Sequence, residues 1–110
     1  MRQSRKGHKK LYNESFRIPK ARGNGILKRE VWVNSNGEVT RYSLAYINHQ
    51  LCQVDSGRVI GYDNSHGHHH RHYFGQEEAI EFTGYADIEQ RFEKEWRALH
   101  GQGDNRSGGC

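Results

Sequence analysis

The chain has 110 residues, of which 33% are hydrophobic, and it carries a formal net charge of +4. This length suits one domain with a small core, and no apolar run approaches the roughly 20 residues of a transmembrane helix. The basic N-terminus lacks the apolar segment of a secretory signal peptide, so we expect a cytoplasmic protein with no membrane partner.

The positive charge is concentrated near the start of the chain. Residues 1–30 hold ten Lys or Arg and two Asp or Glu, a net charge of +8, whereas residues 31–110 carry −4. Residues 1–24 also lack hydrophobic periodicity, so we predict a basic, mostly disordered arm there. Such an arm attracts the phosphates of nucleic acids, although a solvated tail without a ligand has the same composition. The candidate nucleic-acid contacts in the arm are Arg5, Lys6, Lys9, Lys10 and Arg22.

Residues 25–100 are predicted to form a single folded domain, because segment 101–110 has the Gly-rich composition of a flexible tail. Asn36-Gly37 stands between two runs of β-formers and favours the type I′ turn of a β-hairpin. The segments predicted to be extended are 26–33, 38–47, 58–62 and 78–82.

The last predicted element is an amphipathic helix from about Tyr85 to His100. Its apolar residues recur at intervals of three or four, and we assign this stripe to the core: Tyr85, Ile88, Phe92, Trp96 and Leu99. Thr83 or Gly84 is the predicted N-cap. Together these elements predict an α+β domain, in which the helix packs on one face of an antiparallel sheet of about four strands.

The segment before this helix is exceptional, because five of the eight histidines lie within residues 66–72. In an extended strand, side chains alternate between two faces. That alternation would give one face with His68, His70 and His72, and another with His69, Arg71 and Tyr73.

Three interpretations of the histidine segment compete. In the first, two histidines supply the base and the acid for metal-independent cleavage of RNA through its 2′-hydroxyl, with an arginine on the phosphate and a carboxylate orienting one imidazole. In the second, a non-enzymatic module uses the histidines to bind nucleic acid or a zinc or nickel ion. In the third, the histidines are a solvated segment of biased composition. The candidate catalytic residues are Asp63, His70, Arg71 and His72, and the alternative metal ligands are His68, His70 and His72.

The aromatic residues of the strands offer further candidate contacts. Strand tyrosines can stack on bases, but they more often fill the sheet; those in question are Tyr42, Tyr46, Tyr62 and Tyr73. Trp32 faces away from Val31, so it either contacts a partner protein or packs under the helix.

The most specific pattern in the chain is Tyr62-Asp63-Asn64, a short polar gap, and then His70-Arg71-His72. With Phe82 and the helix that carries Phe92 and Trp96, it resembles the TumE family of small toxins from type II toxin–antitoxin systems, over about residues 26–100. The additional histidines before His70 and the basic arm depart from the plainer family pattern. The resemblance implies a growth-inhibiting toxin that acts on RNA or translation and is bound by a helix-turn-helix antitoxin. It points to the same Asp63, His70, Arg71 and His72.

Overall fold

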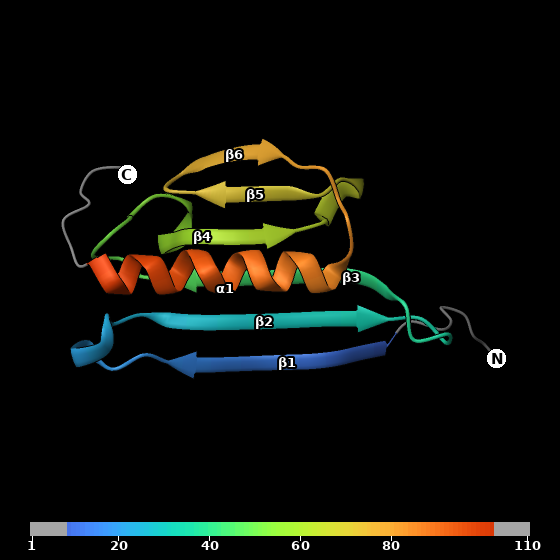
Figure 1. Ribbon diagram of the computed structural model, residues 1–110, viewed down its shortest axis with the longest axis horizontal. Helices are drawn as coiled ribbons and strands as arrows, with labels where there is room; N and C mark the ends of the chain where they lie inside the picture. The colour runs from blue at the N-terminus through green and yellow to red at the C-terminus, as the bar shows by residue number, and fades with distance from the viewer. Residues whose placement is uncertain (1–8, 103–110) are drawn as a thin grey trace.

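The computed structural model describes residues 9–102, which form a six-stranded antiparallel sheet and one α-helix (Figure 1). Each strand pairs with its neighbour in the sequence, so the strand order in the sheet is the chain order. The strands are β1 (Lys9–Arg17), β2 (Ile26–Val33), β3 (Val39–Ile47), β4 (Arg58–Asp63), β5 (His70–Tyr73) and β6 (Gln76–Ala79). The short helical turns between strands are η1 (Lys20–Arg22), η2 (Asp55–Gly57) and η3 (Ser65–Gly67). The predicted α+β class is confirmed, but the sheet has two strands more than expected.

Helix α1 (Tyr85–Gln102) lies on one face of the sheet, over β3 and β4 (Figure 1). Ile88 and Phe92 are buried against the sheet, and the Phe92 ring meets Tyr62 edge-on at 6.4 Å between centroids. The Gly84 carbonyl accepts the first helical hydrogen bond, from the Ile88 N–H at 3.2 Å. The predicted apolar stripe therefore forms the helix side of the core. Among residues 9–102, no helix combines the length and the apolar character that crossing a membrane requires.

Strand β1 falls within the segment predicted to be mostly disordered. It pairs with β2 along its length, from Lys9 opposite Val33 to Arg17 opposite Ile26. All but one of its side chains are exposed, so its sequence carries no alternation of buried and exposed residues. The prediction of disorder was therefore wrong for residues 9–17. It was wrong for residues 18–24 as well, because Ile18 is buried and η1 follows it. The part of that prediction for residues 1–8 lies outside the described residues, as does most of the predicted tail.

The turn between β2 and β3 is not the predicted type I′ turn. Such a turn needs a positive φ at both central residues, whereas of Asn36 and Gly37 only Gly37 has one, at 82°. The Asn34 side chain organises this loop, because its Oδ1 accepts the N–H groups of Asn36 at 2.8 Å and Glu38 at 3.0 Å. The hairpin itself is confirmed, and the side chain of Asn34 explains why a different turn closes it.

Candidate functional site

The two faces of the sheet have different surroundings. Tyr62 and Arg71 point toward α1, where Tyr62 meets Phe92 and Arg71 binds Glu95. Because side chains alternate along a strand, the neighbouring side chains lie on the opposite face. Among residues 9–102 no helix covers this second face (Figure 1), which we call the open face. It carries Lys28, Trp32, Arg41, Ser43, Asp63, His70 and His72.

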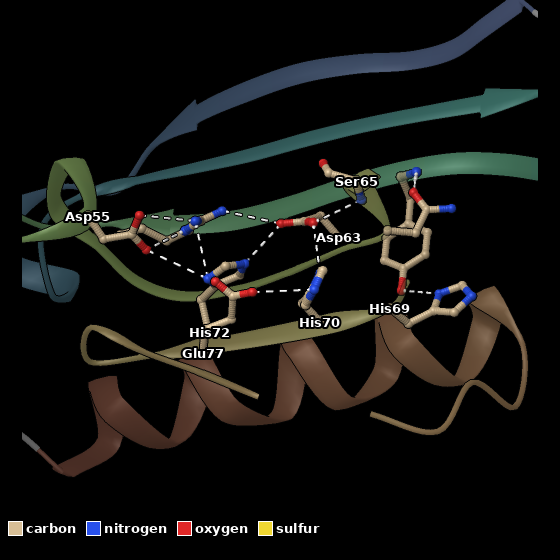
Figure 2. Close-up of polar contacts among 10 residues, drawn as sticks. Asp55, Asp63, Ser65, His69, His70, His72 and Glu77 are labelled. Carbon is tan, nitrogen blue, oxygen red and sulfur yellow. Dashed lines mark hydrogen bonds and ion pairs between the residues drawn. The ribbon is translucent and has the colours of Figure 1, made fainter. Parts of the chain in front are cut away.

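Asp63 stands at the centre of a polar cluster on the open face (Figure 2). Its Oδ2 lies 3.0 Å from His72 Nε2, and its Oδ1 lies 3.7 Å from His70 Nδ1 and accepts the Ser65 N–H at 3.1 Å. Burial alone would raise the pKa of the Asp63 carboxyl, but the Ser65 N–H, His72 and Arg58 together outweigh burial and lower that pKa. Asp63 is therefore ionised at neutral pH, although it is only 7% exposed.

Arg71 does not join this cluster. Its guanidinium lies on the helix side of the sheet and donates to Glu95 at 2.9 Å, to Glu78 at 3.1 Å and to the Tyr62 hydroxyl at 3.2 Å. Burial alone would lower the pKa of Arg71, but Glu95 and Tyr62 outweigh burial and raise that pKa. The middle residue of His70-Arg71-His72 must face away from its neighbours in a strand. The structure thus corrects the predicted grouping of Arg71 with the two histidines.

Arg58 occupies the place that was predicted for Arg71. Its guanidinium lies 3.2 Å from His72 Nδ1 and 3.5 Å from Asp63 Oδ2, and two hydrogen bonds of 2.9 and 3.0 Å hold it to Asp55. Gly61 makes room for this arginine, because a Cβ at that position would stand 2.6 Å from Arg58 Cδ. The cluster therefore contains a guanidinium, although not the predicted one.

The sequence prediction missed Arg58 because strict alternation separates it from Asp63. The two residues are five positions apart, which places them on opposite faces of a regular strand. The pairing of β4 with β3 shifts, however, from Ile60 opposite Tyr46 to Arg58 opposite Ile47, so one extra residue is inserted in β4. Such a β-bulge reverses the alternation and brings Arg58 to the open face. Gly61 between the two charged residues was the available signal in the sequence.

His72 is held at both ring nitrogens. A guanidinium has only donors, so His72 Nδ1 accepts from Arg58, and the ring proton is on Nε2, which donates to Asp63. These two contacts fix the orientation of the His72 ring, and the residue is only 8% exposed. His72 is therefore placed to orient Asp63 and Arg58 rather than to reach a bound molecule.

His70 is held more loosely than His72 and lies at the edge of the cluster. Its Nε2 is 3.3 Å from a carboxylate oxygen of Glu77, whose side chain is 57% exposed. Its Nδ1 faces Asp63, as Figure 2 shows. Rotation of the exposed Glu77 side chain frees Nε2 for another ligand, while the ionised Asp63 remains behind the ring. His70 is thus the histidine of the cluster that is best placed for proton transfer.

The other described histidines of the segment have different surroundings. His69 stacks on Phe82 at 4.0 Å between ring centroids, and its Nδ1 lies 2.9 Å from the Tyr42 hydroxyl. Burial, with smaller effects from His68 and His70, lowers the pKa of His69. His68 is exposed and stacks on His70 at 5.2 Å.

The alternative ligand set of His68, His70 and His72 is not assembled as a metal site. Within the described part of the chain, no three or more His, Cys, Asp or Glu side chains are grouped so that they could hold a metal ion. The cluster that does form is organised by a guanidinium, and a nearby positive charge repels a metal cation.

The candidate nucleic-acid contacts of the arm are separated in space. Lys10 lies on the open face with its Nζ 4.9 Å from the centre of the Trp32 ring, whereas Arg22 lies in η1 beyond the far end of β1. Lys9 is exposed at the start of β1. Arg5 and Lys6 lie outside the described residues.

Three of the four tyrosines considered as base-stacking residues are buried in the core. These are Tyr42, Tyr46 and Tyr62, each 1% exposed or less. Tyr73 is 36% exposed and lies on the helix side, with its ring 4.4 Å from the Arg71 guanidinium carbon. Trp32 is half-buried on the open face, so it does not pack under the helix.

A model of one protein family, described as Toxin TumE, matches residues 15–100. No curated protein and no solved structure matches the chain. The matched segment contains the whole Asp63 cluster, all of β2 to β6 and most of α1.

Proposed function

The chain belongs to the TumE toxin family, and from that premise we propose that it is a ribonuclease whose site is the cluster of Arg58, Asp63, His70 and His72. A toxin of such a system has an antitoxin partner, which we propose to be a helix-turn-helix protein. RNA as the substrate also implies a cytoplasmic location. The observation that carries the proposal is the His70 imidazole, which has the ionised Asp63 behind Nδ1 and the exposed Glu77 carboxylate at Nε2.

The cluster offers the groups that cleavage through the 2′-hydroxyl needs. His70 Nε2 takes the proton of the 2′-hydroxyl, and the 2′-oxygen attacks phosphorus. The bond to the 5′-oxygen breaks, and that oxygen leaves with the proton returned by the His70 imidazolium. The products are a 2′,3′-cyclic phosphate and a 5′-hydroxyl. Asp63 stabilises the imidazolium through Nδ1, and the Arg58 guanidinium stabilises the negative charge that develops on the phosphate.

The test is cleavage of an RNA oligonucleotide by the purified chain, separated from its antitoxin. We expect a 2′,3′-cyclic phosphate product, no cleavage of the 2′-deoxy oligonucleotide, and unchanged cleavage in the presence of a chelator. His70→Ala should lower the rate by about 10²–10⁴-fold, because it removes the proton-transfer group. Arg58→Lys should also slow cleavage, since lysine loses the planar fork that binds Asp55, His72 and a phosphate together.

Arg71→Lys is the matched control for Arg58→Lys, because it makes the same change on the helix side of the sheet. Its rate per folded molecule should equal that of the wild type. A His70→Ala variant that cuts RNA at the wild-type rate would refute the proposal. RNA that is bound but never cut would instead favour the non-enzymatic nucleic-acid-binding module.

A further inference from the structure

The part of the open face that β1, β2 and β3 form carries a row of three long side chains. Lys10 stands opposite Trp32 in the pairing of β1 with β2, and Trp32 stands opposite Arg41 in the pairing of β2 with β3. We call these three residues the Trp32 row. The indole is half-buried, with the Lys10 ammonium 4.9 Å from the ring centre, and Arg41 is exposed beside it. A base that stacks on this ring therefore displaces the Lys10 side chain.

The cations of this surface are not evenly paired with its carboxylates. The carboxylates here have cationic partners: Glu30 pairs with Lys10, and Asp55 and Asp63 pair with Arg58. Lys28 and Arg41 form no ion pair with any residue that the structure describes. Arg41 stands next to Trp32, whereas Lys28 lies four residues farther along β2, beyond Glu30. Each of these two cations can attract an anionic ligand.

A shallow hollow of about 330 Å³ lies between Lys28 and Arg58 of the cluster, and the carboxylates Glu30 and Asp55 also line it. Small side chains form its floor, because Ala45 and Ser43 lie in the middle of the open face. Lys28 borders the hollow on one side, and Arg58 borders it on the other. A ligand that lies in the hollow therefore contacts a free cation and the cluster at the same time.

The distance from the Trp32 row to the cluster follows from the strand register. Glu30, Ser43, Asp63 and His70 stand opposite one another across four strands. Trp32 is two residues beyond Glu30, so with strands about 4.8 Å apart and residues about 3.4 Å apart its Cα lies about 12 Å from that of Asp63. An extended strand of a few nucleotides spans this distance.

We propose that this surface binds single-stranded RNA, with a base stacked on Trp32 and phosphates paired with Arg41 and Lys28. The strand then enters the hollow and presents its next phosphate to Arg58 and His70. This inference takes its ligand from the proposed ribonuclease function and adds the route by which the substrate reaches the site. A duplex does not fit this arrangement, because its bases are paired and cannot lie on an indole.

The experiment measures binding of a fluorescein-labelled, 2′-O-methyl oligouridine, which cannot be cleaved through its 2′-hydroxyl, by fluorescence anisotropy. Trp32→Ala should weaken binding by about 5- to 150-fold, the range expected for one stacked base. Trp32→Phe, which keeps an aromatic face, should retain most of the affinity. Arg41→Ala and Lys28→Ala should each reduce the slope of log affinity against log salt by about 0.7, because each removes one phosphate contact.

Two matched controls lie on the helix side of the molecule. Phe16→Ala removes an exposed aromatic ring, and Lys94→Ala removes an exposed cation of α1. Both should bind the oligouridine as the wild type does. Melting temperatures of all variants show that the altered proteins are folded, and Arg41→Ala keeps the test valid if Trp32→Ala does not fold.

The results separate this inference from the ribonuclease proposal. Loss of binding in Trp32→Ala and Arg41→Ala, but not in the controls, supports the surface even if the protein never cuts RNA. Wild-type affinity in Trp32→Ala, or an equal loss in Phe16→Ala and Lys94→Ala, overturns it even if the protein does cut RNA. If the open-face variants do not change RNA binding, this surface does not bind RNA, and Trp32 is instead a contact for a partner protein.

Discussion

At the scale of single residues, Asp63 links the groups of the cluster and depends on being ionised. The lowered pKa of Asp63 means that the folded state holds its carboxylate more strongly than the unfolded chain does. This stabilisation is complete above the ordinary carboxyl pKa of 3.8 and is lost as the pH falls through the lower folded value. The negative charge of Asp63 provides this stabilisation, so an uncharged side chain of the same shape does not.

We therefore expect Asp63→Asn to melt below the wild type at neutral pH, and the difference to shrink as the solution is acidified below pH 4. Thermal unfolding of both proteins, followed by circular dichroism across this pH range, measures the effect. Glu81→Gln, an exposed carboxyl that precedes α1, serves as the control. A difference between wild type and Asp63→Asn that stays constant with pH would contradict the assigned role of the charge.

Gly61 is the second residue on which the site depends, because the Arg58 side chain lies against it. An added methyl group would stand 2.6 Å from Arg58 Cδ and 3.1 Å from the Leu44 carbonyl oxygen. We expect Gly61→Ala to destabilise the fold by about 1–3 kcal/mol, the usual cost of overpacking, and to slow RNA cleavage by moving the guanidinium. Urea unfolding of Gly61→Ala, Arg58→Ala and the double variant tests the contact. If the arginine is the obstacle, the double variant is more stable than the sum of the two changes predicts.

At the scale of elements, the strands and the helix that bury an apolar face could be predicted from the sequence. Strand β2 and helix α1 were predicted because their apolar residues follow the periods of a strand and of a helix. Strand β1 was not, because backbone pairing with β2 specifies it while its side chains remain in water. The bulge in β4 was not predicted either, because it arises from pairing with β3 and Gly61 was its one local signal. Asp63, His70 and His72 were therefore predicted correctly as neighbours, whereas the cationic partner was not.

The ion-pair network around Arg71 joins β5 and β6 to the helix. Arg71 binds Glu78 of β6 and Glu95 of α1, and Glu95 also accepts the Tyr62 hydroxyl at 2.9 Å. We expect Arg71→Lys to lower the free energy of unfolding by about 1–3 kcal/mol, because hydrogen bonds to these partly buried charged groups are lost. Hydrogen exchange should show the loss of protection mainly in β6. If Arg71→Lys instead keeps its stability but no longer cleaves RNA, Arg71 takes part in catalysis.

At the scale of the whole molecule, the proposal predicts a defined effect on growth. Expression of the chain alone should slow growth, and co-expression of the antitoxin should relieve the effect. His70→Ala, at equal levels of folded protein, should be harmless, because it removes the proton-transfer group and leaves the fold intact. Growth curves with immunoblots of the expressed protein measure both. Slow growth with His70→Ala would mean that toxicity does not require the cluster.

The neighbour-to-neighbour order of the six strands also bears on how the chain folds during synthesis. Every strand pairing closes only a short loop, so the contacts are local and the sheet can grow one hairpin at a time as the chain leaves the ribosome. The element that covers the core, however, is α1, an 18-residue helix at the end of the described chain. Ile88 and Phe92 therefore reach the sheet last. A nascent chain can therefore have its strands in register while its core stays open to water, until α1 has left the ribosome and packs on the sheet.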